Sequence, residues 1–356
     1  LSFETAPATP NERLSIIAGG DSRNHREARR KANLLVGKLR PHAVLFAGDM
    51  TGGATSEQWQ QWLNDWQLTI APDGRMTPIL VARGNHEPDN ETLVNLFDVP
   101  SPMVYYALTL GGNLLRTYTL NSMIPSGASQ RTWLEKDLQQ NSDVIWKIAQ
   151  YHHSIRPHSK VKDEKLELYK NWATLFYEHS VNVVVESDAH VVKWTYPIRP
   201  SREPGSEEGF IRDDLNGTVY VGEGCWGAPL RTNDDNKSWT RNSGRFNQFK
   251  WLWIDENRIE IRTVMTDAGE KTMPLATNKK FELPLGIKLW QPSNGSVVTI
   301  EKTIVEEPPI AVVANEPPPR TSTPKPPRPV PKKQLPKLYV DLNSGQIQVR
   351  YKMPRE

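Results

Sequence analysis

The sequence is poor in cysteine and contains no long hydrophobic run. Cys225 is the only cysteine among 356 residues, which excludes an intrachain disulfide and leaves the redox compartment undecided. No apolar run approaches the roughly 20 residues that a membrane-spanning helix needs. The amino-terminal LSFETAPATP has neither an initiator Met nor a charged-then-apolar signal segment. Such a start suits a mature chain after signal cleavage, and a recombinant chain equally well.

The sequence also lacks a strong charge of one sign in its main part. The formal net charge is +3, but residues 320–356 hold nine Lys and Arg against two acidic residues. The first 319 residues therefore carry a formal charge of −4. Because nucleic-acid binding depends on basic surfaces, we expect no nucleic-acid partner for the main part of the chain.

The alternation of sequence patterns predicts an α/β layered fold. Hydrophobic residues make up 37% of the chain and include 12 tryptophans, enough for a sizeable core. Short β-branched runs alternate with longer helical patterns. The expected strands are 14–18, 43–47, 78–82, 144–150 and 181–185, and the expected helices are 25–40, 56–67, 130–140 and 163–179. From Gly217 onward strand patterns follow one another, which predicts antiparallel strands and a further hairpin within 287–304.

The carboxy-terminal 50 or so residues differ from the rest in composition. Residues 306–336 contain eleven of the 29 prolines, which is typical of an extended, semi-rigid linker. The alternative is a ligand for proline-binding grooves. Residues 337–356 contain two short strand patterns, too little chain to bury a core of its own. We therefore expect a main domain at 1–305, a linker at 306–336, and a short β segment at 337–356 that is a truncated module or docks elsewhere.

Polar residues follow each of the five expected strands. These endings place Asp21, Asp49, Asn85, His152 and His190 just beyond the strands. One such ending is an ordinary turn, and a lone histidine often only caps a strand. The carboxyl ends of strands in an α/β sheet converge on one crevice, so five polar endings together predict a site. Carboxylate, amide and imidazole ligands suit divalent metals, and two such ions can activate water beside a phosphoryl group.

The order of these motifs resembles that of the calcineurin-like metallophosphoesterases, most closely their purple acid phosphatase-like branch. The resemblance rests on GGDSR, AGDM, GNHE, YHHS and SDAHVVKWTYPI, with QRTWLEKDL before the fourth motif, and covers roughly residues 13–265. It implies a four-layer αββα sandwich with a dinuclear metal centre on one rim, so that residues 1–305 would form the catalytic domain. It also implies a phosphate-ester substrate, attacked in line by a metal-activated hydroxide without a covalent enzyme intermediate.

The resemblance assigns roles to individual residues. The ligands of two divalent or trivalent ions (Mn, Fe, Zn or Mg) would be Asp21, Asp49, Asn85, His152, Asp188 and His190. Asp49 would bridge the ions. His86 would contact the phosphate or protonate the leaving group, held by Glu87. His153 would be a supporting or substrate-binding residue, and His158 would lie on the rim.

Three departures from the family pattern affect the expected metal site. Arg23 stands where most members have a metal-binding histidine, and Gly52 stands where purple acid phosphatases have a tyrosine, so their iron–tyrosinate chromophore is not expected. Asp188 replaces a histidine of the second site, and its carboxylate would favour harder cations. Arg23 cannot bind a metal. It would either clamp a substrate phosphate or form a salt bridge with Asp21 or a neighbouring carboxylate.

Other polar and aromatic candidates carry less weight. His25 and Asp89 are alternatives for the first metal shell, although nothing in their spacing favours either. Cys225, in the glycine-rich GEGCWGAP, is expected to be a buried apolar residue because no activating base is indicated. Trp194 and Trp226 would line the substrate pocket or pack in the core.

The departures also define a rival function, a degenerate member that binds one metal or none and acts as a binding or surface protein. Against it stands the cost of gathering buried carboxylates without a cation. The segment LYVDLNSGQIQVRYKMP resembles the start of the carboxy-terminal sorting modules of type IX secretion cargo, without their usual Asn-Pro. This resemblance implies a secreted, periplasmic or cell-surface location, with association with the cell envelope through the tail.

Overall fold

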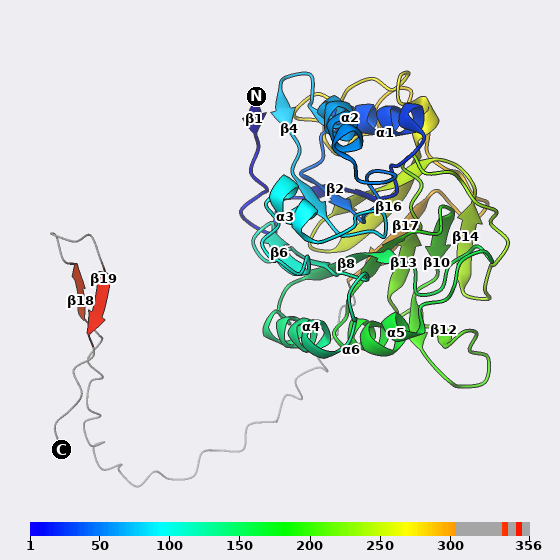
Figure 1. Cartoon of the computed structure of the whole chain (residues 1–356). Coiled ribbons are helices and arrows are strands. Elements are labelled where there is room, and N and C mark those ends of the chain that lie inside the picture. The colour runs from blue at the N-terminus through cyan, green and yellow to red at the C-terminus, as the bar shows by residue number, and fades with distance from the viewer. Residues whose placement is uncertain (303–336, 341–346, 351–356) are drawn as a thin grey trace, which may run out of the picture. The chain divides into compact units, whose positions relative to one another are not determined.

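The computed structural model describes residues 1–302, 337–340 and 347–350 and divides into two compact units, Leu1–Ile304 and Val305–Glu356 (Figure 1). In the second unit the described residues form an antiparallel pair, β18 (Lys337–Val340) and β19 (Ile347–Arg350). The predicted linker at 306–336 lies outside the described residues. Within the described part of the chain, no helix is long and apolar enough to cross a membrane.

Two mixed sheets form the centre of the first unit. The six-stranded sheet has the order β17 (Val297–Glu301), β16 (Arg258–Met265), β15 (Gln248–Ile254), β2 (Leu14–Gly19), β3 (Ala43–Phe46) and β5 (Ile79–Val81). The seven-stranded sheet has the order β14 (Thr240–Gly244), β10 (Val192–Thr195), β13 (Val219–Gly222), β9 (Val183–Ser187), β8 (Trp146–His153), β7 (Leu115–Thr119) and β6 (Tyr106–Leu110). All five expected strands are confirmed, three in the first sheet and two in the second.

The sheets pack face to face, and helices cover their outer faces, which gives the αββα layering that the resemblance implied (Figure 1). Alternation along each strand divides the side chains between two cores. In β2, Ile16 and Ala18 join the core between the sheets, and Ile17 joins the core beneath the helices. The covering helices are α1 (Arg26–Leu39) and α2 (Ser56–Trp66) on one side, and α4 (Ala128–Gln140), α5 (Leu166–Leu168) and α6 (Thr174–Glu178) on the other.

Smaller elements complete the unit. They are α3 (Glu91–Phe97), two short 3₁₀ helices (Gln67–Thr69 and Thr266–Ala268), the strand pair β1 (Ser2–Phe3) and β4 (Arg75–Met76), and the pair β11 (Ile198–Pro200) and β12 (Phe210–Arg212).

Two sequence predictions differ from the structure. The helix expected at 163–179 begins at Leu166 and contains a π-helical stretch, Tyr169–Ala173. The hairpin expected within 287–304 does not form, because β17 pairs with β16 instead. The other half of the expected hairpin reaches the same strand through one bridge, Leu289 to Val264. The open edge of β16 thus takes both segments, a choice that local sequence cannot reveal.

Candidate metal centre

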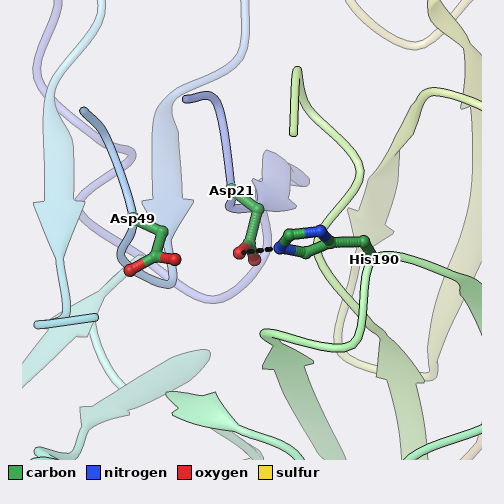
Figure 2. A group of neighbouring side chains, drawn as sticks. All are labelled: Asp21, Asp49 and His190. Carbon is green, nitrogen blue, oxygen red and sulfur yellow. Dashed lines mark hydrogen bonds and ion pairs between the residues drawn. The ribbon is translucent and has the colours of Figure 1, made fainter. Parts of the chain in front are cut away.

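Three buried side chains from different strand ends meet on one rim of the sandwich. Asp21 follows β2, Asp49 follows β3, and His190 lies between β9 and β10. A ligand atom from each lies within 4.8 Å of those of the other two. In Figure 2 both carboxylates point into the same space, and the His190 ring directs Nε2 toward Asp21 at 2.9 Å. These three residues form a buried group, called the first position, that could hold one metal ion.

A second group of ligands gathers around His152 at the end of β8. Its Nε2 lies 3.1 Å from Asn85 Oδ1, 3.4 Å from Asp49 Oδ1 and 3.7 Å from Asp188 Oδ1. Asp49 therefore belongs to both groups, as a bridging ligand must. The structure brings together all six residues expected to bind metal.

The backbone is strained at four of these residues. Asp21, Asp49, Asp188 and His190 have φ angles of 59°, 58°, 69° and 55°, in the left-handed region that non-glycine residues rarely adopt. The surrounding fold maintains the strain, since the Asp21 N–H donates to the Gly48 carbonyl at 2.9 Å and the Asp188 N–H to Asp21 Oδ2 at 2.9 Å. Such strain clusters at functional sites.

The glycine-rich segment around Cys225 serves this site through Gly224. A Cβ on Gly224 would lie 1.7 Å from Asp21 Oδ2, and its φ is +69°. Only glycine therefore fits beside the Asp21 carboxylate. Cys225 itself is buried, and burial raises the pKa of its thiol, as expected for a residue that packs in the core. Trp194 and Trp226 are fully buried core residues and do not line a pocket.

The hydrogen bonds of the two histidines fit them for metal binding. Nδ1 of His152 faces the Ala47 carbonyl at 2.8 Å, and Nδ1 of His190 faces the Pro229 carbonyl at 2.8 Å. A carbonyl only accepts, so both Nδ1 atoms carry the proton and donate it. In the neutral ring each Nε2 directs its lone pair at carboxylate oxygens, an arrangement that needs a cation or a proton between them. The residues present therefore fit a metal centre.

The pKa shifts in the site are consistent with a requirement for positive charge between the carboxylates. Burial alone would lower the pKa of His152, but the carboxylates of Asp49, Asp21 and Asp188 raise it to about 9. Burial alone would raise the pKa of Asp21, yet His152 and His190 hold it below its ordinary value. A proton on His152 thus takes the part that a cation would fill.

His86 and Glu87 support the site in different ways from those expected. The His86 ring, partly exposed, places Nδ1 2.6 Å from the Gly52 carbonyl and Nε2 3.8 Å from Asp49 Oδ2. The Glu87 carboxylate accepts backbone N–H groups of Asp49, Met50 and Gly84 at 2.8–2.9 Å. The expectation that Glu87 holds His86 is corrected. Gly52 orients the ring, and Glu87 fixes the turns beside it.

Arg23 forms the salt bridge that the sequence offered as one alternative, with Asp49 as its partner. Its Nε donates to Asp49 Oδ2 at 3.1 Å, and its Nη2 lies 3.4 Å from His190 Nε2. The other candidates for the first shell lie elsewhere. His25 is exposed, and Asp89 accepts the Thr92 N–H at the start of α3.

The other two histidines of the segment YHHSIRPHS, His153 and His158, differ in exposure. His153 is partly exposed, and burial together with the charge of His152 lowers its pKa to about 4, so it is neutral near pH 7. Its substrate-binding role stays a prediction. His158 was expected on the rim but is completely buried, with Nε2 2.7 Å from Thr240 Oγ1. The backbone N–H of His158 donates to Glu223, so His158 is a buried structural residue rather than a rim residue.

Sequence reasoning missed two residues that contact the candidate ligand Asp188 and a buried lysine that pairs with two carboxylates. Lys162 Nζ donates to Asp188 Oδ1, and Arg231 Nη1 donates to the Asp188 carbonyl at 2.6 Å. Beneath the site, buried Lys193 Nζ donates to both Glu186 and Glu223 at 2.5 Å. Lys162 lies in a charge-rich stretch that is typical of an exposed loop, so no local signal identified it.

A family comparison agrees with this geometry. Residues 20–192 match the family model of the calcineurin-like phosphoesterases, a range that holds all six candidate ligands. No curated protein matches the sequence.

Solved structures share the fold at low sequence identity. A purple acid phosphatase, PPD1 from yellow lupin seeds, aligns over 84% of this chain and 56% of its own, with 16% identity and a TM-score of 0.66. PhoD aligns over 83% of this chain and 71% of its own, with 10% identity and a TM-score of 0.55. GAP50, the anchor in the inner membrane complex of Plasmodium, aligns over 80% of this chain and 98% of its own, with 12% identity and a TM-score of 0.53. This chain thus spans just over half the length of the lupin protein.

Proposed function

We propose that this chain, a member of the calcineurin-like metallophosphoesterase superfamily, is a metal-dependent hydrolase of phosphoric esters. One observation carries the proposal. The Nδ1 atoms of His152 and His190 donate to backbone carbonyls, so Nε2 is the atom of each ring that can bind a metal, and both Nε2 atoms face buried carboxylates. Such a donor set is suited to a divalent cation, which would neutralise the buried carboxylates.

The ligands divide between two positions. One ion would be held by Asp21 and His190. The other ion would be held by Asn85, His152 and Asp188, and Asp49 would contact both ions. Bound ions would supply an activated water and neutralise charge on the phosphoryl oxygens. Mixed oxygen and nitrogen ligands admit Mn, Fe, Zn or Mg, and the carboxylate of Asp188 favours the harder of these.

The remaining side chains would act on the substrate. Because Nδ1 of His86 donates to Gly52, its Nε2 is aimed at the space above Asp49, where an imidazolium would protonate the leaving oxygen. Arg23 reaches the same space with its guanidinium fixed by Asp49. Its Nη2 has only a long contact with His190, which leaves a donor for a phosphate oxygen.

A second function is favoured by one specific observation. Arg23 and Lys162 already place positive charge on the ligand carboxylates of Asp49 and Asp188. A chain that neutralised its ligands in this way would have little need for ions and would serve as a binding protein. GAP50, which shares the fold, is an anchor.

Hydrolysis by metal-stripped protein separates the two functions. Mn, Fe, Zn and Mg are returned one at a time, and release of an aryl alcohol from a phosphate monoester and a diester is followed. Hydrolysis is expected to require metal, and its rate is expected to fall at least 100-fold in His86→Ala. A matched control is His179→Ala, a histidine far along the chain at the end of α6. Absence of turnover with every metal would favour the binding protein.

The location of the protein is a separate proposal that rests on the tail sequence alone. A secreted or envelope-associated protein is expected in the periplasmic, surface or culture fraction of the native host. Recovery from the cytosol alone would contradict it.

A further inference from the structure

A lysine from a loop occupies part of the second metal position. Lys162 Nζ donates to Asp188 Oδ1. The same oxygen lies 3.7 Å from His152 Nε2, which in turn lies 3.1 Å from Asn85 Oδ1. The ammonium therefore contacts an oxygen that an ion in the second position would use.

The fold holds the loop that carries Lys162. This loop, residues 154–165, connects β8 to α5. The Ile155 N–H donates to Glu186 Oε1 at 2.8 Å, and the His158 N–H donates to Glu223 Oε2 at 3.0 Å. Both acceptors are completely or almost completely buried. Lys162 therefore extends from an anchored loop rather than from a free surface segment.

The backbone of Asp188, the partner of Lys162, is fixed as well. The Asp188 N–H donates to Asp21 Oδ2 at 2.9 Å, and its carbonyl accepts from Arg231 at 2.6 Å. The Asp188 side chain is 7% exposed and that of Lys162 is 22% exposed, so water screens this ion pair less than a surface pair. With the Asp188 backbone held in place, an ammonium and a divalent ion that both contact Asp188 Oδ1 compete for this oxygen and repel each other.

We propose that Lys162 is a built-in cation that competes with a divalent ion for Asp188, so that the second position binds its ion more weakly than the first. This inference rests on the proposed metal centre. It makes occupancy of the second position depend on displacement of the lysine, while the first position, formed by Asp21, Asp49 and His190, fills at lower metal concentration.

Calorimetric titration of the metal-stripped full chain with Mn²⁺ tests the proposal, with bound metal counted after gel filtration. Lys162→Met should tighten binding of the second ion at least tenfold. Lys162→Gln, which keeps a donor for Asp188 without the charge, should do the same. Lys162→Arg should resemble the unaltered chain. Lys160→Met is the matched control, because Lys160 is an exposed lysine of the same loop whose backbone N–H bonds to Asp234.

The results separate this inference from the proposed function. Unchanged or weaker binding of the second ion in Lys162→Met, or equal tightening in Lys160→Met, would overturn the role of Lys162. If metal-dependent hydrolysis persists in that case, the phosphoesterase proposal stands. A chain that binds no Mn²⁺ and hydrolyses no ester in any variant would overturn both.

Discussion

Removal of the Lys193 ammonium should cost about 3–5 kcal/mol of unfolding free energy. Lys193 Nζ lies 2.5 Å from Glu186 Oε2 and 2.5 Å from Glu223 Oε1, and its side chain is 1% exposed. Burial alone would lower the pKa of Lys193, but the two carboxylates raise it. Lys193→Met would leave two buried carboxylates without a counter-charge, and removal of one partner of a buried ion pair costs about that much.

The magnitude translates into a measurable shift in urea. For a domain of this size, unfolding free energy falls by about 3 kcal/mol per molar urea, so the midpoint should drop by about 1–1.7 M. The triple variant Lys193→Met, Glu186→Gln, Glu223→Gln should recover at least half of the loss because no unpaired charge remains.

Lys250 provides the matched control for this prediction. It is as buried as Lys193, but its Nζ donates to Thr263 Oγ1 at 2.9 Å, and burial lowers its pKa to about 7. Lys250→Met should therefore change stability little or raise it. A loss below about 1 kcal/mol in Lys193→Met, or an equal loss in Lys250→Met, would refute the argument from paired charge.

Two further predictions follow from the structure. Gly224→Ala should weaken Mn²⁺ binding and hydrolysis at least 100-fold, because the new Cβ would lie 1.7 Å from Asp21 Oδ2. Gly205→Ala is the control: its Cβ would meet no atom closer than 4.0 Å, so binding and hydrolysis should stay largely unchanged. Equal losses in the two variants would contradict the steric argument. Burial, with the charge of Lys280, lowers the pKa of His42 to about 4. The neutral form of His42 should therefore contribute about 3 kcal/mol to the unfolding free energy above about pH 6.5, and this contribution should be lost as the pH falls toward 4. Urea unfolding across this range should show a flatter pH profile for His42→Asn, and an unchanged profile would disprove the assignment.

The site residues that the sequence predicted are those that directly follow a single strand. Each strand is a short apolar run followed by polar residues, and the chain direction brings these ends to one rim. Asp21, Asp49, Asn85, His152 and His190 are therefore identifiable from the sequence alone. The same local logic placed the strands within one to three residues of their observed ends.

The parts that sequence could not predict depend on contacts between distant segments. Lys162 meets Asp188 only because buried carboxylates anchor its loop. In the sequence Lys193 is one polar position of a strand pattern. In the structure its strand β10 lies between β14 and β13, so its ammonium is buried and pairs with carboxylates inside the protein. The failed hairpin within 287–304 has the same cause, because the open edge of β16 competed with a local partner.

The most direct test of the proposed metal-dependent phosphoesterase activity is aryl phosphate hydrolysis by metal-stripped protein reloaded with Mn²⁺, beside Asp49→Asn. This isosteric change keeps the shape of the residue that is proposed to contact both ions and removes its charge. The account predicts turnover that needs metal and falls at least 1,000-fold in Asp49→Asn, a loss of about 4 kcal/mol of transition-state stabilisation. Turnover without metal, or an Asp49→Asn variant as active as the unaltered chain, would contradict it.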